Sequence, residues 1–344
     1  MSTSATVQPA RWPGGAFLRR LASSPALRVS GRRLLSAIPV LWGVTLLAFL
    51  VMNALPGDAA SALLGINATK AEIRAFSIKL HLNEPLWTRY GHWLAGVVTG
   101  NLGTSLASPQ SVASILGQRL PVTLELVLFA LIITLVVSVP VSVLCARRPG
   151  GVVDRLSLVL SMGSISIAPY VLALLAVIVF CVKWSVFPAI GYVPLSQGIG
   201  GNLHTMTLPS IILAVPLIGF YIRFLRADLV EQMQAEDYIV TARAKGVSEW
   251  RVLTRHALRN SFIGLLTVIG LNLATLIGAT VIVEDIFSLP GIGYELLNAI
   301  SNRNVPVVEG IVLVFGIAVV LANLLTDLLY GVLDPRIRHV RSRS

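Results

Sequence analysis

The residues that could carry out chemistry are few in this chain, and they form no catalytic pattern. The five histidines have neither metal-ligand nor triad-like spacing with acidic residues: they are His81, His92, His204, His256 and His339. The Gly-rich loop ending in Gly-Lys-Ser/Thr, which binds nucleotide phosphates, does not occur in the sequence. The sequence therefore predicts a chain without catalytic residues, without a metal site and without a cofactor of its own.

Charged side chains gather instead in the polar stretch 236–261. Within it, Tyr238, Ile239 and Ala242 have helical spacing and share one face. Gly246 can adopt the left-handed conformation that ends a helix, and Ser248 is a natural N-cap for a second short helix. Such an ordered pair of helices would offer a docking surface to a partner. The pattern alone supports a solvated loop between two membrane helices equally well.

The composition indicates which kind of element must flank and position the stretch 236–261. Hydrophobic residues make up 55% and charged residues 12% of the 344 residues, which is typical of a membrane protein. A helix needs about 20 apolar residues to cross a hydrocarbon core of roughly 30 Å. Six stretches approach or exceed this length: 34–52, 126–146, 157–182, 205–222, 262–283 and 310–333. We therefore predict an all-α polytopic membrane protein with six transmembrane helices.

The distribution of basic residues predicts the orientation, because Lys and Arg concentrate on the cytoplasmic side of membrane proteins. Most of the 27 basic residues lie inside if both termini are cytoplasmic. A long loop, residues 53–123, is then periplasmic, and the loop 223–261 is cytoplasmic. We expect residues 1–30 to form a mobile cytoplasmic tail and residues 31–344 to form the transmembrane domain. The net charge of +11 is then explained by the lipid bilayer, since no nucleic-acid recognition module accompanies it.

Three aromatic residues of the long loop suggest a helix at the membrane interface. Trp87, Tyr90 and Trp93 recur at helical spacing. Aromatic rings are common where a membrane meets water. The spacing therefore favours an interfacial amphipathic helix over substrate stacking.

Four residues within the predicted helices are candidates for a translocation path. Pro169 and Pro216 would bend their helices and free a backbone carbonyl. Asn272 is an amide in the middle of a span, and Thr275 lies on the same Gly- and Thr-rich helix. Simple packing kinks and a structural hydrogen bond of Asn272 explain these residues equally well.

Ordered sequence signatures give the chain a family resemblance. The run Asp-Tyr-Ile-Val-Thr-Ala-Arg-Ala-Lys-Gly at 237–246 resembles the cytoplasmic EAA loop of bacterial ABC-importer permeases of the dipeptide/oligopeptide/nickel family. Val240, Thr241 and Arg259 depart from the broader EAA pattern, but the ending Ala-Leu-Arg-Asn at 257–260 is usual in this branch. Further signatures are Leu-Pro-Gly-Asp at 55–58, Leu-Asn-Glu-Pro-Leu at 82–86, Gly-Asn-Leu-Gly-Thr-Ser-Leu at 100–106, Arg-Leu-Pro-Val-Thr-Leu-Glu-Leu at 119–126, Glu-Asp-Ile-Phe-Ser-Leu-Pro-Gly-Ile-Gly at 284–293, Asp-Leu-Leu-Tyr at 327–330 and Leu-Asp-Pro-Arg-Ile-Arg at 333–338.

The resemblance implies the permease subunit of a binding-protein-dependent ABC importer in the bacterial cytoplasmic (inner) membrane. It implies a second homologous permease, two ATPase subunits that bind ATP and Mg, and a solute-binding protein as partners. The residues implied to contact the ATPase are Glu236, Asp237, Tyr238, Ile239, Thr241, Ala242, Arg243, Ala244, Lys245 and Gly246. Those implied to face the solute-binding protein are Glu284, Asp285, Pro290 and Gly291, although these residues by themselves favour a capped turn.

The sequence does not identify the cargo, and it leaves one alternative class of transporter to consider. Di- and oligopeptides fit the resemblance best, while the same importer type also carries nickel, glutathione or sugars. An ion-coupled secondary transporter is the rival from a different class. It should show acids deep in its spans or inverted repeats. Asp327 is the one acid within a predicted apolar stretch, and no repeat is evident.

Overall fold

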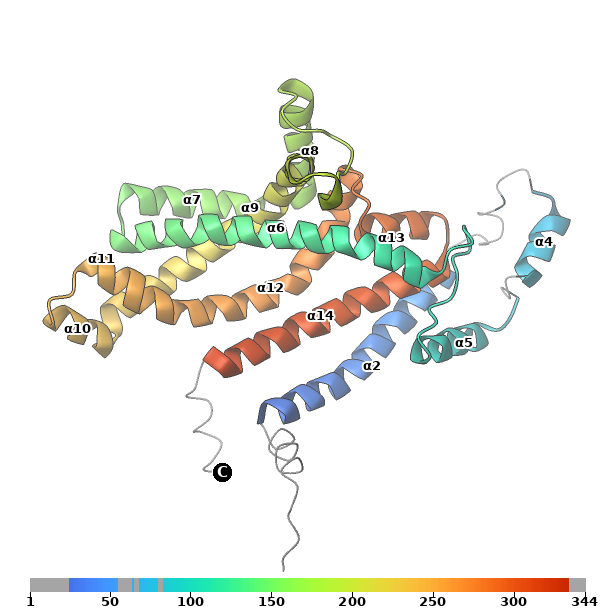
Figure 1. Ribbon diagram of the computed structural model, residues 1–344, viewed down its shortest axis with the longest axis horizontal. Coiled ribbons are helices and arrows are strands. Elements are labelled where there is room, and N and C mark those ends of the chain that lie inside the picture. The colour runs from blue at the N-terminus through green and yellow to red at the C-terminus, as the bar shows by residue number, and fades with distance from the viewer. Residues whose placement is uncertain (1–24, 55–63, 65–67, 80–82, 334–344) are drawn as a thin grey trace, which may run out of the picture.

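The protein is a bundle of long helices (Figure 1). The computed structural model describes residues 25–54, 64, 68–79 and 83–333. Over these residues no β-strand forms, and the only β-type pairing is an isolated bridge between Thr104 and Ser111. Most of the predicted N-terminal tail, the signature at 55–58 and all but the first residue of the signature at 333–338 lie outside the described residues. The first helix already begins at Pro25, inside the predicted tail.

Among the residues that the structure describes, five helical segments are long and apolar enough to cross a membrane, and a bent pair of helices adds a sixth. The five are α2 (Pro25–Ala54), α6 (Val112–Arg147), α9 (Ile199–Ala235), the run Glu249–Ile286 that ends in α12 (Leu258–Ile286), and α14 (Val305–Leu333). The bent pair is α7 (Val152–Ser166) followed by α8 (Pro169–Ala176) and the π-helix η1 (Val177–Lys183). Each predicted stretch falls within one of these segments, so the all-α polytopic fold is confirmed.

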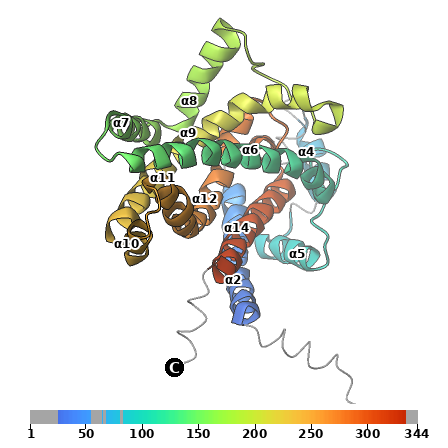
Figure 2. The same cartoon turned by 60° about the vertical axis from the view of Figure 1, so that its left-hand side comes forward.

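The third predicted span is not a single helix. Its two parts meet at an angle of 99°. Ile167 and Ala168 between them have extended backbone, with ψ of 124° and 135°, and Pro169 begins α8. A proline disfavours helical backbone at the preceding residue but is tolerated in a first turn, so the helix breaks there. Pro209 and Pro216, by contrast, stay inside α9. Figures 1 and 2 show α8 projecting sideways from the bundle.

Helices α6 and α9 pack along each other in the centre of the bundle. On α6, Ala130, Thr134, Ser138 and Ser142 are buried at a spacing of four, so they share one face. Small side chains allow two helix backbones to approach closely. The hydroxyl of Ser142 donates a hydrogen bond of 3.3 Å to the carbonyl oxygen of Ile222 in α9.

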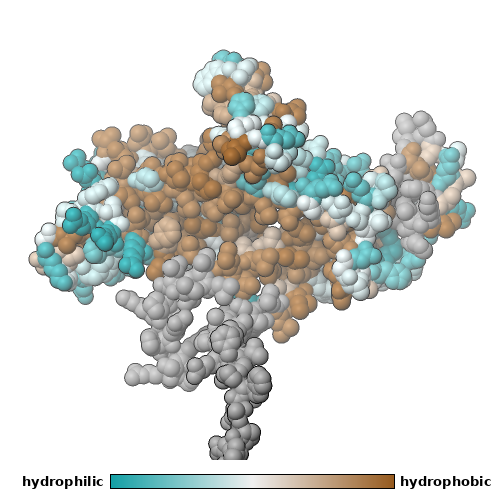
Figure 3. All heavy atoms as spheres, viewed as in Figure 1, coloured by the Kyte–Doolittle hydropathy of each residue, from teal (hydrophilic) through white to brown (hydrophobic). Residues whose placement is uncertain are grey.

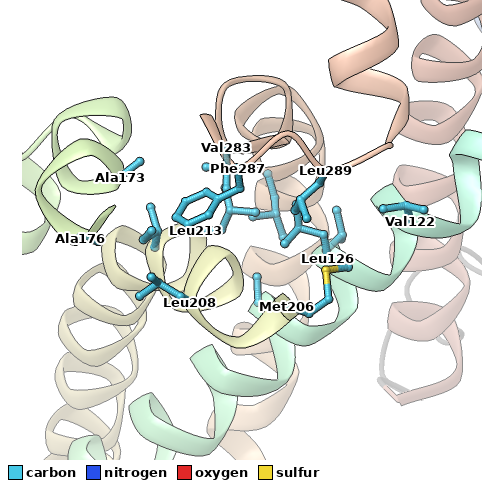
Figure 4. Close-up of a cluster of buried hydrophobic side chains, with 14 residues drawn as sticks. Val122, Leu126, Ala173, Ala176, Met206, Leu208, Leu213, Val283, Phe287 and Leu289 are labelled. Carbon is cyan, nitrogen blue, oxygen red and sulfur yellow. The ribbon is translucent and has the colours of Figure 1, made fainter. Parts of the chain in front are cut away.

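Larger apolar side chains close one end of this core. Figure 4 shows Leu126 of α6, Met206 and Leu213 of α9, and Phe287 and Leu289 after α12 gathered in one place. All five are buried members of one cluster. This cluster fixes the end of α12 against α6 and α9.

The remaining elements lie at the two ends of the bundle. One end, the α13 end, carries α4 (Lys70–Lys79), α5 (Leu86–Val98) and α13 (Ile292–Ser301). The other, the α10 end, carries α10 (Asp237–Ala244), α11 (Glu249–Arg251) and the π-helix η3 (Val252–Ala257). The short helix η2 (Leu195–Gln197) lies in the segment before α9. Hydrophobic residues cover the middle and hydrophilic residues cover both ends in Figure 3, as expected of a chain that crosses a bilayer.

The predicted aromatic helix is α5, and it is held to α2. Tyr90 is buried, its hydroxyl lies 3.0 Å from Thr45 Oγ1, and it donates a 3.2 Å hydrogen bond to the Trp42 carbonyl. The Tyr90 ring stacks on Trp93 with centroids 5.8 Å apart, whereas Trp87 is exposed. Two of the three aromatic side chains therefore pack within the protein.

Candidate functional site

Residues 236–261, called the α10 hairpin below, contain the break predicted at Gly246. Helix α10 ends at Ala244, and Gly246 has a φ of +78°, in the left-handed region that favours glycine. The Gly246 amide donates a 2.9 Å hydrogen bond to the Arg243 carbonyl, which closes the turn. Ser248 occupies the N-cap position of the next helix, but its side chain makes no capping hydrogen bond. The predicted cap is therefore positional only.

The second half of the α10 hairpin is not a separate short helix. Helix α11 continues through η3 into α12, so one helical run extends from Glu249 to Ile286. Trp250, Leu253 and Ala257 have the spacing of one α-helical face, but only Leu253 and Ala257 are buried. Trp250 is 48% exposed, and its ring lies 5.6 Å from the Arg147 guanidinium. The π-helix η3 has a wider turn than an α-helix, so its residues depart from the α-helical period.

Helix α10 contacts the bundle with one face only. Ile239 and Ala242 are buried in a cluster with Leu229 of α9 and Leu253 of η3, and Tyr238 is half-buried beside them. The shared face predicted for these residues of α10 is therefore confirmed. The side chains on the opposite face and at the end of the helix are exposed: Asp237, Val240, Thr241, Ala244 and Lys245.

Gln232, near the end of α9, joins three elements by hydrogen bonds. Its Oε1 accepts from the Tyr238 hydroxyl of α10 and, at 3.1 Å, from Asn260 Nδ2 of α12. Its Nε2 donates at 3.1 Å to Ser261 Oγ of α12 and at 3.1 Å to Asp228. Burial raises the pKa of the Tyr238 phenol, which keeps the hydroxyl protonated as a donor. Because Gln232 is buried, losing it would leave several polar groups unpaired.

Arg243 closes the α10 hairpin from the other side. Its Nε and Nη2 donate to the Glu249 carboxylate at 2.7 and 3.1 Å, and its Nη1 donates to the Met233 carbonyl at 3.1 Å. An exposed ion pair of this kind adds little stability. Its two-point geometry instead fixes α10 relative to the end of α9 and the start of the next helix.

At the α13 end, Glu284 of α12 is completely buried. Its Oε1 accepts a 2.7 Å hydrogen bond from the Thr123 hydroxyl, and its Oε2 accepts from the amides of Gly293 at 2.7 Å and Tyr294 at 3.0 Å. The Thr123 hydroxyl also accepts from the Ile292 amide at 2.8 Å. The carboxylate thus satisfies free amides at the N-terminus of α13. These five residues are called the glutamate cradle below.

The glutamate cradle corrects the assignment of Glu284 to a surface that faces a solute-binding protein. Its carboxylate is bonded inside the protein, as a capped turn requires. Gly291 is also buried, and a Cβ atom there would lie 2.6 Å from Glu284 Oε1, so the glycine makes room for the carboxylate. Pro290 is half-buried, and Asp285 is the exposed member of the predicted set. Asp285 is therefore the member of the set that a partner could reach most readily.

The four candidate path residues lie on α8, α9 and α12, which pack against one another. Asn272 donates a 2.9 Å hydrogen bond to the Val268 carbonyl one turn earlier, which fits the structural alternative. Pro169 and Pro216 are half-buried, and Thr275 is exposed on α12. The three helices are thus brought together, and the role of these residues in a path stays a prediction.

Sequence reasoning missed two acids, one half-buried and one buried, because each directly precedes a predicted apolar stretch. Glu125 of α6 accepts hydrogen bonds from the Tyr192 hydroxyl at 2.7 Å and from Asn202 Nδ2 at 2.5 Å. Burial and the neighbouring Glu125 raise the pKa of Tyr192 to about 12, so the phenol stays a donor. Glu309 is buried near the start of α14. An apolar stretch in the sequence is counted only as far as the nearest charged residue, whereas the observed helix continues past that residue.

A further missed contact ties α7 to α9. Arg226 donates from Nε and Nη2 to the two carboxylate oxygens of Asp154, at 2.9 and 2.7 Å. Asp154 also accepts a 2.8 Å hydrogen bond from the Gly150 amide. No local pattern relates residues this far apart in the chain, so sequence periodicity could not find the pair.

Metal ligation finds no support among the described residues, where no three His, Cys, Asp or Glu side chains form a group that could hold an ion. Cys145 and Cys181 are both free thiols, and Cys145 is buried 2.8 Å from Ser157 Oγ. The side chains of both ends are therefore arranged for hydrogen bonding and packing between helices.

Comparison with known proteins matches nearly the whole chain to transport components. Residues 138–339 match the family described as binding-protein-dependent transport system inner membrane component, and residues 26–127 match its N-terminal family. A Brucella abortus (strain 2308) protein, whose name places it among peptide transport system permeases, is 40% identical over 308 residues. The oligopeptide transport system permease protein AppB of Bacillus subtilis (strain 168) is 35% identical over 311 residues. The dipeptide transport system permease protein DppB of Escherichia coli (strain K12) is 36% identical over 332 residues. Each alignment covers 90% of this chain and 98% of the relative.

Proposed function

This chain belongs to the family of binding-protein-dependent transport system inner membrane components, and we propose that it is the permease subunit of an ATP-driven importer of di- and oligopeptides. It is a multi-pass protein of the bacterial inner membrane. In this proposal the α10 end lies in the cytoplasm and the α13 end faces the periplasm, in line with the distribution of basic residues. A second homologous permease completes the translocation path.

The attachment of α10 on one face only is the observation that carries the proposal. Ile239 and Ala242 anchor the helix, while Asp237, Val240 and Thr241 stay exposed beside one another. An exposed apolar residue such as Val240, 59% accessible, is suited to a protein contact. We place this face in a cleft on one of two ATPase subunits, which bind ATP and Mg.

The hydrogen bonds of Gln232 explain how a push on α10 would reach the membrane helices. A displaced α10 pulls on Gln232 through Tyr238, and Gln232 is bonded to Ser261 at the start of α12. The α10 hairpin is also continuous with α12, so both α9 and α12 follow the movement. ATP-driven closure would in this way shift the permease between two states without any chemistry in this chain.

The glutamate cradle would transmit a movement of α12 to the α13 end. Glu284 lies near the end of α12 and bonds to Thr123 of α6 and to the first amides of α13. Thr275, exposed on α12, and Asn272 would then line the path where the two permeases meet. The exposed Asp285 is our candidate contact for the solute-binding protein.

Reversing a charge and adding bulk on the exposed face of α10 tests the ATPase contact. In the complex co-expressed with its partners, Asp237→Lys and Thr241→Trp should reduce ATPase copurification and peptide uptake at least tenfold, because they reverse a charge and add bulk on the contact face. Neither side chain supports the fold of this chain, so both variants should still fold. Arg251→Glu, another exposed substitution in the α10 hairpin but off α10, should leave both within about twofold. Normal uptake by both α10 variants would reject the contact.

Uptake assays on the same preparation identify the energy source and the cargo. An importer of this type takes up peptide only with ATP, whereas an ion-coupled transporter takes it up when an ion gradient is imposed without ATP. Competition of labelled dipeptide uptake by unlabelled peptides, nickel, glutathione or sugars identifies the cargo. Competition by a non-peptide alone would reject the peptide assignment while leaving the importer assignment intact.

A further inference from the structure

A hollow of about 380 Å³ opens beside the α10 hairpin, and its lining is basic. It is lined by Tyr238, Arg255, His256, Arg259, Asn260 and Ile263. Tyr238 and Asn260 already bond to Gln232, which leaves the arginines and the histidine to meet a ligand. Arg255 and Arg259 are exposed, and neither guanidinium group forms an ion pair or a hydrogen bond with any residue in the described part of the chain.

The depth of the hollow places it where a bilayer meets water. The hydrogen bond from Gln232 to Ser261 sets the start of α12 level with the end of α9, beyond the Arg226–Asp154 ion pair. Directly after Ser261 the apolar part of α12 begins with Phe262, which is 41% exposed, and Ile263, which lines the hollow. Two guanidinium groups therefore lie beside the first apolar side chains of a membrane span.

We propose that this hollow binds the phosphate of an anionic phospholipid. Arg255 and Arg259 would donate to the phosphate oxygens, since guanidinium groups match phosphate geometry. The acyl chains would follow Phe262 and Ile263 along α12. A protein carboxylate could satisfy the arginines but would leave these apolar side chains without a matching contact. Basic pockets between membrane helices at a headgroup level are suited to anionic headgroups. The proposal does not depend on the ATPase contact of α10.

Lipid binding to the purified full-length chain in detergent tests the site. Native mass spectrometry with palmitoyl-oleoyl phosphatidylglycerol and the matching phosphatidylcholine should show at least a tenfold preference for the anionic lipid. Each arginine near an anionic headgroup contributes about fivefold in affinity. The double variant Arg255→Gln/Arg259→Gln should therefore bring the two lipids to within about twofold of each other. Both side chains are exposed, so an unchanged gel-filtration profile is expected.

Arg251→Gln is the matched control, because Arg251 is exposed in the same hairpin and does not line the hollow. It should keep the lipid preference of the wild type. Equal loss in the control, or an unchanged preference in the double variant, would overturn the site. Displacement of phosphatidylglycerol from the wild type by millimolar inorganic phosphate would overturn the lipid assignment in favour of free phosphate. A double variant that keeps its lipid preference but loses ATPase subunits would identify the hollow as a protein contact.

Discussion

The hydroxyl of Thr123 donates a 2.7 Å hydrogen bond to the buried carboxylate of Glu284, and it connects two membrane helices through one atom. Thr123 lies on α6 and Glu284 on α12. The same oxygen accepts the Ile292 amide at 2.8 Å, so the start of α13 is held as well. Every group in this arrangement is buried, and none has water as an alternative partner. The α13 end is therefore sensitive to the loss of a single hydroxyl.

Thr123→Val should lower the free energy of unfolding by about 1–3 kcal/mol, because it leaves the Ile292 amide and one Glu284 oxygen unpaired in a buried site. Valine keeps the shape of the side chain, so packing is little changed. Denaturant unfolding in detergent measures the effect. Thr123→Ser retains the hydroxyl and should recover most of the stability. Equal stability of the valine variant and the wild type would contradict the role of the hydroxyl.

Two glycines on neighbouring helices offer a matched pair for the contact between α7 and α9. A Cβ atom on Gly219 of α9 would lie 2.8 Å from the Ser161 carbonyl and would overlap the Ser164 hydroxyl, whereas one on Gly163 of α7 would meet nothing within 4 Å. Gly219→Ala should therefore destabilise the protein by about 1–3 kcal/mol through overpacking. Gly163→Ala should be neutral or slightly stabilising, because alanine favours helices. Similar melting temperatures for the two variants would contradict the close approach.

The raised pKa of Tyr192 predicts an alkaline transition in stability. The native state holds the phenolic proton more tightly than the unfolded state, because burial and Glu125 raise its pKa to about 12 from an ordinary value of 10.0. The contribution of Tyr192 to stability is therefore complete below pH 10 and is lost as the pH rises towards 12. The difference in tyrosinate absorbance between the wild type and Tyr192→Phe should titrate near pH 12. A midpoint near 10 would show that the Tyr192 phenol is neither buried nor bonded to Glu125.

Features encoded in neighbouring residues could be predicted from the sequence. The apolar runs located every span, and the helical spacing of Ile239 and Ala242 with Gly246 after them located α10 and its end. The sequence predicts a bend at both Pro169 and Pro216, yet only Pro169 follows extended backbone and begins a new helix. Whether a proline kinks or breaks a helix depends on what the two halves pack against, which no local pattern contains.

Features that depend on distant pairing could not be predicted. Gln232 has no unusual neighbours in the sequence, and its importance comes from Tyr238, Asn260 and Ser261 meeting it in the folded chain. Glu284 was compatible with a surface contact or a capped turn until its burial favoured the turn. The sequence contains the charge of such a residue but not the environment that decides its role.

Gln232→Ala should separate ATP hydrolysis from transport if the Gln232 network carries movement from α10. The substitution leaves the exposed face of α10 unchanged, so ATPase subunits should still copurify. It also leaves Tyr238, Asn260 and Ser261 without their shared partner, so a displaced α10 would pull less strongly on α12, to which it would be joined only by the continuous chain and by packing. We expect peptide uptake to fall at least fivefold while ATP hydrolysis stays within about twofold, with both measured in proteoliposomes. Gln234→Ala is the control, because Gln234 is exposed on the same part of α9. If uptake and hydrolysis fell together in Gln232→Ala, or if the ATPase subunits were lost, the network would serve stability and not coupling.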